Sequence, residues 1–232
     1  LNTTSFTLGL RRDQNSVYGN TTNPRIAVVS QVTKKLTLKV LYGSAFRAPD
    51  SFDSFTSTST RIPNPNLEPE LTDNMEIGLG YQFDNEFYLE TNLFNNKLTN
   101  TIVSNVNIGD IDGDGAANTQ NKNLGNAKIY GLEIKAQFIL SDNLKGFSNV
   151  SYQSANQEFL DVQSDIPNDA KLKANFSLTW QYHEDLSFYI ISRYVGERTT
   201  PITNPRNKVD HYFVTDLNIL KRRLFGKNIS IS

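Results

Sequence analysis

The residues best suited to metal chemistry lie in one short acidic stretch, "DIDGDG", which begins at Asp110. Carboxylates at positions 1, 3 and 5 and a glycine at position 6 form the first half of a calcium-binding loop. Position 12 would be Asn121, where an EF-hand requires a bidentate glutamate, and no flanking helices are predicted. Asp110, Asp112 and Asp114 are therefore candidate ligands of a weak Ca²⁺ site, and a solvated Asp/Gly turn is the favoured alternative.

A second candidate site lies in the long polar segment "AFRAPDSFDSFTSTSTRIPNPNLEPE", which follows a strictly alternating run. A two-residue turn would join two strands at a lower entropic cost, so a loop of this length indicates a functional surface. Its prolines fix φ and remove hydrogen-bond donors, and "NPNLEPE" is expected to turn the chain back into the next strand. The candidate ligand contacts are Arg47, Asp50, Asp53, Arg61 and Asn64.

Catalytic chemistry has little support in the sequence. Cysteine is absent, so there is no disulfide, no thiolate metal site and no cysteine nucleophile. The two histidines are His183, in an expected turn, and His211, at an expected strand start. No residues resemble a Ser/His/Asp triad, a phosphate-binding glycine loop or a catalytic pair of carboxylates. We therefore expect a protein that is not an enzyme.

The charge balance excludes one class of partner. The chain has 232 residues, with 23 Lys and Arg against 24 Asp and Glu, and no basic face is visible, so nucleic acid is not an expected partner. The mean hydropathy is -0.45, and no apolar run approaches the roughly 18–20 residues of a membrane helix. This test does not detect membrane strands, which are apolar on only one face.

An alternation of apolar and polar residues recurs along the whole chain. It is strict over residues 36–43, 74–83 and 171–182. Successive side chains of a strand face opposite sides, so each segment has one apolar and one polar face. Weaker alternation predicts strands near residues 4–12, 25–33, 86–96, 128–140, 144–153, 186–195 and 212–221, with another beginning at 228–232. We predict an all-β chain.

Short and long connections alternate between these strands. Short polar turns are expected at 33–35, 84–86, 141–143 and 183–185, and long loops at 13–24, 46–72, 97–126, 154–169 and 196–211. This asymmetry gathers the long loops at one end of the sheet, as in outer-membrane barrels. The aromatics expected to form an interfacial girdle are Tyr42, Phe46, Tyr81, Phe83, Phe138, Trp180 and Tyr182.

The pattern thus favours an antiparallel transmembrane β-barrel. A soluble carbohydrate-binding β-sandwich, in which the aromatics would lie in the core, remains the alternative. About ten or eleven strands are present, and open edges of such strands would aggregate. We expect the chain to be a fragment of a larger closed sheet.

Four motifs, in order along the chain, resemble the C-terminal half of the barrel of TonB-dependent outer-membrane receptors. They are "FRAP" with "NPNLEPE" and the strand after it, "NLGNAKIYGLEIKAQF", "RYVGERT" and "YFVTDLNI". The resemblance covers essentially the whole chain. The motif residues are Phe46, Arg47, Ala48, Pro49, Asn64, Pro65, Asn66, Leu67, Glu68, Pro69, Glu70, Gly131 and Glu133.

This resemblance implies a barrel of 22 strands with an N-terminal plug, of which residues 1–232 would be the C-terminal part without the plug. It implies location in the outer membrane of a Gram-negative bacterium, in contact with its lipid. The expected function is uptake of a scarce small-molecule nutrient, such as siderophore-bound iron or cobalamin. Energy would come from the TonB complex through the N-terminal region, and no cofactor would be required.

Two further expectations concern the ligand. Haem receptors of this family carry a histidine between the same two boxes, whereas residues 50–63 contain none, so haem is disfavoured. A passive, porin-like barrel remains the alternative function.

Overall fold

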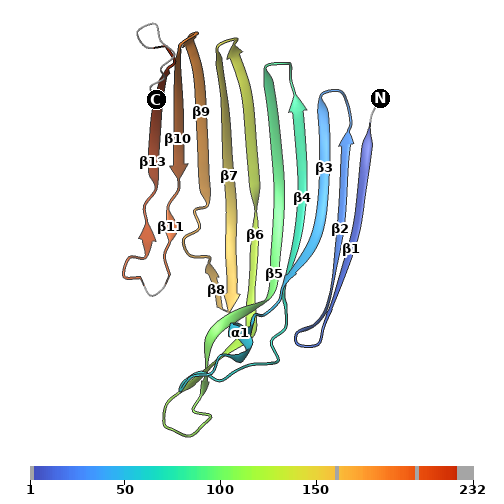
Figure 1. The fold of residues 1–232 in the computed structure, drawn as a ribbon, viewed down its shortest axis with the longest axis vertical. Coiled ribbons are helices and arrows are strands. Elements are labelled where there is room, and N and C mark those ends of the chain that lie inside the picture. Colours follow the sequence, from blue (N-terminus) through green and yellow to red (C-terminus); the bar gives the residue numbers. More distant parts are fainter. Residues whose placement is uncertain (1–2, 160–161, 202–203, 224–232) are drawn as a thin grey trace.

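The computed structural model describes residues 3–159, 162–201 and 204–223, and within them the chain forms one curved antiparallel sheet (Figure 1). Ten strands lie side by side in the order β1-β2-β3-β4-β5-β6-β7-β9-β10-β13, and β8 pairs with the end of β7. No helix of the described part is long and apolar enough to cross a membrane. The all-β, antiparallel fold predicted from the sequence is confirmed.

The strands follow the alternating segments closely. Their bounds are β1 Thr4–Asn15, β2 Gly19–Gln31, β3 Leu36–Arg47, β4 Glu70–Gln82, β5 Phe87–Gly109, β6 Asn118–Ser141, β7 Leu144–Phe159, β8 Val162–Asp165, β9 Leu172–His183, β10 Leu186–Val195, β11 Arg198–Thr199, β12 Lys208–Val209 and β13 Tyr212–Lys221. The one helix among the described residues is α1, Ser51–Phe55. The strand expected at 228–232 lies outside the described residues.

Side-chain oxygens close the short turns. Thr33 Oγ1 accepts hydrogen bonds from the backbone N–H groups of Lys35 (3.1 Å) and Leu36 (3.0 Å). Asp84 Oδ1 does the same for Glu86 (2.9 Å) and Phe87 (2.8 Å). These bonds replace the ladder where pairing stops, and the expected short turns are confirmed.

Two of the expected long loops are wrong. The predicted loop at 13–24 is mostly strand, because β1 pairs with β2 as far as Asn15 and Gly19. Only residues 16–18 form a tight turn, and Gly19 follows it with a φ of 85°. Most of 97–126 is strand, because β5 and β6 remain paired up to Gly109 and Asn118. Both segments are rich in asparagine and glycine, which are depleted in strands, and strand pairing overrides this weak local preference.

The other three long connections are present; two of them are shorter than expected, and the third, at 196–211, has the predicted bounds. The loop predicted at 46–72 lies between Arg47 and Glu70 and contains α1. The loop at 154–169 begins only after Phe159 and includes β8, and the loop at 196–211 contains β11 and β12. In Figure 1, α1 and the extended β5–β6 hairpin lie at the end of the sheet opposite the short turns.

One face of the sheet is apolar and uncovered. Its members include Ile77, Leu93, Phe176 and Leu217, and the last is 61% exposed. The buried apolar residues of the described part are Ala27, Leu67, Ala155 and Ala170, too small a set to form a core for a sheet of this size. The sheet therefore lacks the packed second layer of a β-sandwich, and its apolar face needs another partner.

Aromatic side chains gather on the apolar face near the short turns. Tyr81 packs against Phe83 with ring centroids 4.6 Å apart, and Trp180 packs against Tyr182 at 5.1 Å and Phe188 at 5.5 Å. Farther along the strands a second, looser row contains Tyr42, Tyr130 and Tyr152, all of which are exposed. Of the expected girdle residues, Phe46 lies apart, near Tyr18 at the other end of the sheet.

Gly131 has a packing role. It is paired with Phe94 across β5 and β6, and a Cβ atom at Gly131 would lie 2.8 Å from Phe94 Cζ and 2.3 Å from the carbonyl oxygen of Tyr152. The Phe94 ring therefore occupies the space above the glycine. This close approach explains why the expected motif strand has glycine at this position.

Candidate functional site

The β5–β6 hairpin extends beyond its neighbours. Pairing of β4 with β5 ends at Thr99, and pairing of β7 with β6 ends at Gly125. Residues 100–124, which we call the arm, therefore project past the sheet, with residues 100–109 of β5 and 118–124 of β6 in strand, a length on the order of 20–30 Å. The outer segment, residues 48–69, lies against this arm and contains most of the candidate ligand contacts.

A cluster of three charged side chains links the two ends of the outer segment. Arg47 and Glu70 are paired across β3 and β4, and Arg47 Nε lies 2.5 Å from Glu70 Oε2. The same guanidinium contacts Asp53 Oδ2 at 3.2 Å through Nη1. Glu70 Oε1 also accepts a hydrogen bond from the backbone N–H of Ile102 (2.7 Å), so this group reaches the arm.

Helix α1 is held by a capping box. Asp50 Oδ1 accepts a hydrogen bond from the N–H of Asp53 at 2.6 Å, and Asp53 Oδ2 accepts one from the N–H of Asp50 at 3.4 Å. These reciprocal bonds satisfy donors that a helix start leaves free. Asp50 and Asp53 therefore shape the loop, and Asp53 also positions Arg47.

Two asparagines of the arm bind the backbone of the outer segment. Asn121 Nδ2 donates to the carbonyl of Asp53 (3.0 Å), and its Oδ1 accepts from the N–H of Asn105 (3.2 Å). Asn123 Oδ1 accepts from the N–H of Glu68 (2.9 Å), while its Nδ2 donates to the carbonyls of Glu68 (2.9 Å) and Asn100 (2.8 Å). We call this pair the amide dock.

Backbone contacts extend the docked interface toward the tip of the arm. Thr119 donates its N–H to the carbonyl of Thr60 (2.8 Å) and accepts from Ile62 (2.9 Å). Arg61 forms a parallel bridge with Thr119. Its guanidinium lies 4.8 Å from the Phe52 ring and donates to the Phe52 carbonyl (3.2 Å). Arg61 thus contacts both the ring and the carbonyl of Phe52, which lies in α1.

The "NPNLEPE" motif, the last part of the outer segment, is also bound to the arm. Asn64 Nδ2 donates to the carbonyl of Asn121 at 2.8 Å, and Asn64 Oδ1 accepts from the N–H of Asn66 at 3.1 Å. Leu67 is only 2% exposed, and Glu68 Oε2 accepts from Asn100 Nδ2 at 3.2 Å. The motif therefore holds the outer segment on the arm before the chain enters β4, which agrees with the turning role expected from the sequence.

The structure thus brings three of the five candidate contacts, Arg47, Asp50 and Asp53, into one group and places Arg61 and Asn64 farther along the interface. All five hydrogen-bond within the protein. Sequence reasoning missed the docking role of the arm asparagines. Exposed aromatic surface remains on α1, where Phe52 and Phe55 are 65% and 52% exposed.

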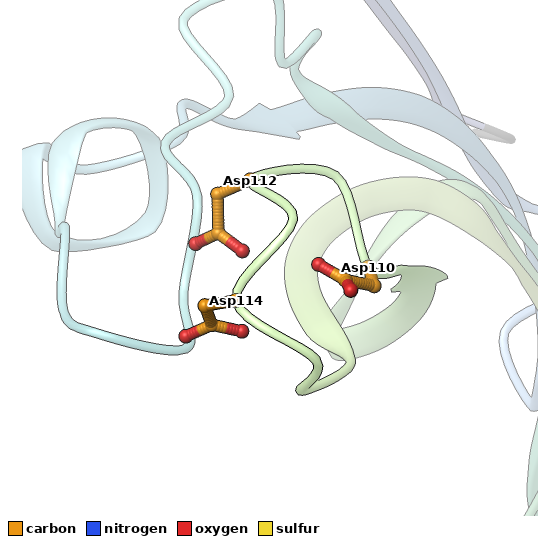
Figure 2. A group of neighbouring side chains, drawn as sticks. All are labelled: Asp110, Asp112 and Asp114. Carbon is orange, nitrogen blue, oxygen red and sulfur yellow. The ribbon is translucent and has the colours of Figure 1, made fainter.

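The acidic loop lies at the tip of the arm. Figure 2 shows the three carboxylates on one loop, with Asp112 and Asp114 close together, and all three groups lie within 4.8 Å of one another. Asp110 accepts from the N–H groups of Gly113 (2.7 Å) and Gly115 (3.0 Å). The hydrogen bond from the Asn118 amide lowers the pKa of Asp112 below its ordinary value.

These bonds limit what the loop can offer a metal ion. All three residues are exposed, and their carboxylates already bind backbone or amide donors within the hairpin. Asn121, at the twelfth position, is committed to the amide dock. The carboxylates could supply oxygen ligands to a hard cation such as Ca²⁺, but the chain offers no bidentate glutamate there.

The remaining motif residue, Glu133, lies far from this site. It lines a cavity of about 570 Å³ on the polar face of the sheet, together with Lys39, Glu76, Glu90, Lys135 and Gln153. Lys39 Nζ lies 3.3 Å from Glu90 Oε1. The polar face thus carries paired charges and is suited to a water-filled interior.

Comparison with known proteins gives one consistent result. A family model described as "TonB dependent receptor-like, beta-barrel" matches residues 1–231. The heme/hemopexin utilization protein C of Haemophilus influenzae is 28% identical over 90% of this chain and 32% of its own length. The ferric enterobactin receptor of Pseudomonas aeruginosa is 29% identical over 84% of this chain and 29% of its own length.

Solved structures agree on the fold. A crystal structure of a mutant ferric enterobactin receptor from Pseudomonas aeruginosa superposes with a TM-score of 0.78 and 23% identity, covering 96% of this chain and 35% of the other. The siderophore receptor PirA from Acinetobacter baumannii gives a TM-score of 0.79 and 16% identity, covering 96% of this chain and 38% of the other. The chain spans about a third of the length of these proteins.

Proposed function

Since the chain belongs to the TonB-dependent receptor β-barrel family, whose model matches residues 1–231, we propose that it forms the late part of the barrel of an outer-membrane receptor. The whole protein would take up an iron chelate, with energy supplied by the TonB complex through the N-terminal part of the receptor. Family members are transport receptors and not enzymes, and the proposal assigns no catalysis to this chain.

The observation that carries the proposal is the asymmetry of the sheet, with an uncovered apolar face, a polar face and all elaborated connections at one end. The two aromatic rows, for example at Phe138 and Tyr130, are eight residues apart along β6. That is about 26 Å along a strand and about 20 Å after a tilt of roughly 40°. This height is close to the apolar band of outer-membrane barrels, about 25 Å, so lipid would cover the apolar face.

Iron chelates are favoured over haem as the ligand. The loop between the two motif boxes contains no histidine. His183 lies at the short-turn end, and His211 packs beside Tyr194 at 5.9 Å. Two relatives from Pseudomonas aeruginosa are named ferric enterobactin receptors, which makes ferric enterobactin the first ligand to test. We propose that ligand binding needs no cofactor and that Ca²⁺ would be an accessory ion at Asp110, Asp112 and Asp114.

The test is uptake of radioactive iron as ferric enterobactin, by cells that produce the whole receptor and lack other enterobactin receptors. We expect uptake that stops when a protonophore collapses the proton-motive force. Uptake that continues unchanged with the protonophore would instead support the passive, porin-like barrel. Recovery of the whole protein from the soluble fraction would contradict both functions. Calorimetric titration with Ca²⁺ tests the accessory site, for which we expect a dissociation constant no lower than about 10⁻³ M.

A further inference from the structure

A second cavity lies at the outer end of β7, β9 and β10, away from the amide dock. Its volume is about 280 Å³, and its lining combines Ala155, Leu172, Tyr194 and Gly196 with three cationic and three acidic side chains. The acidic ones are Asp165, Asp169 and Glu197, and Asp169 is paired with Lys173 at 3.1 Å. Pockets that bury whole drug-sized ligands are typically about 300–1,000 Å³. This cavity is therefore suited to one functional group of a ligand rather than to a complete metal chelate.

Two of the three cations are committed to carboxylates. Lys171 Nζ lies 3.1 Å from Asp165 Oδ2, and Lys208 Nζ lies 3.0 Å from Glu197 Oε2. The hydrogen bonds in these pairs raise the pKa of each lysine above its ordinary value. Both lysines therefore stay charged, and each has its charge balanced locally.

The third cation, Arg198, is different. Within residues 3–159, 162–201 and 204–223, its guanidinium forms no ion pair, and its buried Nη1 atom has no hydrogen-bond partner. The guanidinium carbon lies 5.7 Å from the centre of the Tyr212 ring, so one side of the planar group is covered by an aromatic face. Leaving a buried donor of a charged group unpaired costs free energy. This cost indicates that Arg198 binds a hydrogen-bond acceptor from outside the described residues.

The surrounding backbone holds Arg198 in place. Arg198 pairs with Val209 in the small β11–β12 sheet. The next residue, Thr199, accepts a hydrogen bond from the N–H of Asn168 at 2.7 Å, and Gly196 donates to the carbonyl of Leu172 at 2.8 Å. The main chain around Arg198 is thus tied to the loop before β9 and to β9 itself, while the Tyr212 ring contacts the guanidinium.

We propose that this cavity is a binding subsite for a carboxylate group of a small molecule, with Arg198 as its principal contact. A guanidinium matches the geometry of a carboxylate through two parallel N–H donors, and the apolar wall would accept the carbon skeleton that carries it. The inference rests on the proposed receptor function, because it assigns the subsite to part of the nutrient that the receptor captures.

Benzoate is a suitable probe, because it combines a carboxylate with an apolar body, and benzamide is its uncharged counterpart. Binding is measured by calorimetry with the whole receptor in detergent micelles. We expect saturable binding of benzoate but not of benzamide, and a loss of benzoate affinity of at least about tenfold in Arg198→Gln. Arg198→Lys, which keeps the charge without the planar fork, should give a smaller loss. The matched control is Arg206→Gln on the same loop, an exposed position, which should leave the affinity unchanged.

Equal benzoate affinity in the wild type and Arg198→Gln would overturn the proposal. So would the absence of saturable benzoate binding to the wild-type receptor, since the acceptor for Arg198 would then belong to another part of the protein. Far-UV circular dichroism of each variant excludes unfolding as the cause of a loss. Iron uptake in the same strains separates the two hypotheses: no uptake by the wild type contradicts the receptor function, whatever the benzoate result.

Discussion

Replacing Asn123 with alanine should release the end of the outer segment from the arm. The substitution removes three hydrogen bonds, two with the backbone of Glu68 and one with the carbonyl of Asn100. At a net value of about 1 kcal/mol each, the loss amounts to about 3 kcal/mol of local stability. An opening equilibrium changes tenfold for each 1.4 kcal/mol, so hydrogen exchange at Glu68 should accelerate on the order of 100-fold.

The assay is native-state hydrogen exchange of the whole receptor, followed by mass spectrometry of peptides that cover residues 64–72. The matched control is Asn126→Ala, since Asn126 is exposed, lies on the same strand and forms no side-chain hydrogen bond with another described residue. Its exchange should match the wild type. If Asn123→Ala also exchanges within about twofold of the wild type, the amide dock does not hold the outer segment, and the reasoning from these contacts is wrong.

Three further predictions concern the sheet and the tip of the arm. Arginine at Ile134, midway between the aromatic rows, should lower the free energy of unfolding by about 2–4 kcal/mol in denaturant titrations in lipid, whereas Ser151→Arg on the polar face should cost far less. Gly131→Val should cost about 1–3 kcal/mol in the same titration, because its Cβ would collide with the Tyr152 carbonyl; an unchanged midpoint would contradict the packing role. The pKa of Asp112 is lower in the folded hairpin than in the unfolded chain, so the ionised carboxylate stabilises the folded hairpin at any pH above its ordinary pKa of about 3.9. This stabilisation should be lost as the pH falls from the ordinary pKa through the lower, folded-state pKa. Proteolysis at the tip should accelerate over that range with an acid-stable protease, and a rate that does not depend on pH would contradict it.

Much of the fold could be predicted because alternation and turn chemistry are local. The strands at 186–195 and 212–221 have the predicted bounds, and the turn at 84–86 follows from the capacity of Asp84 to bind the next N–H groups. The extension of β5 to Gly109 could not be predicted locally, since its polar residues become a strand only through pairing with β6.

The candidate site was harder to predict for the same reason. The sequence indicated that residues 46–72 contain a functional loop, and it named Arg47 and Asp53, which the structure joins. It could not indicate that Asn121 and Asn123 hold this loop, because the partners are more than fifty positions apart in the chain. The residue type of an asparagine and its neighbours in the sequence do not indicate which distant main-chain group its side chain will bind.

The amide dock has a consequence for how such a protein can diverge. Asn121 and Asn123 bind the outer segment largely through main-chain atoms of Asp53 and Glu68, which every amino acid possesses apart from the N–H that proline lacks. The side chains between those two anchor points can therefore change identity without loss of these bonds. Sequence variation can thus accumulate along the outer segment while its two main-chain anchor points stay in place.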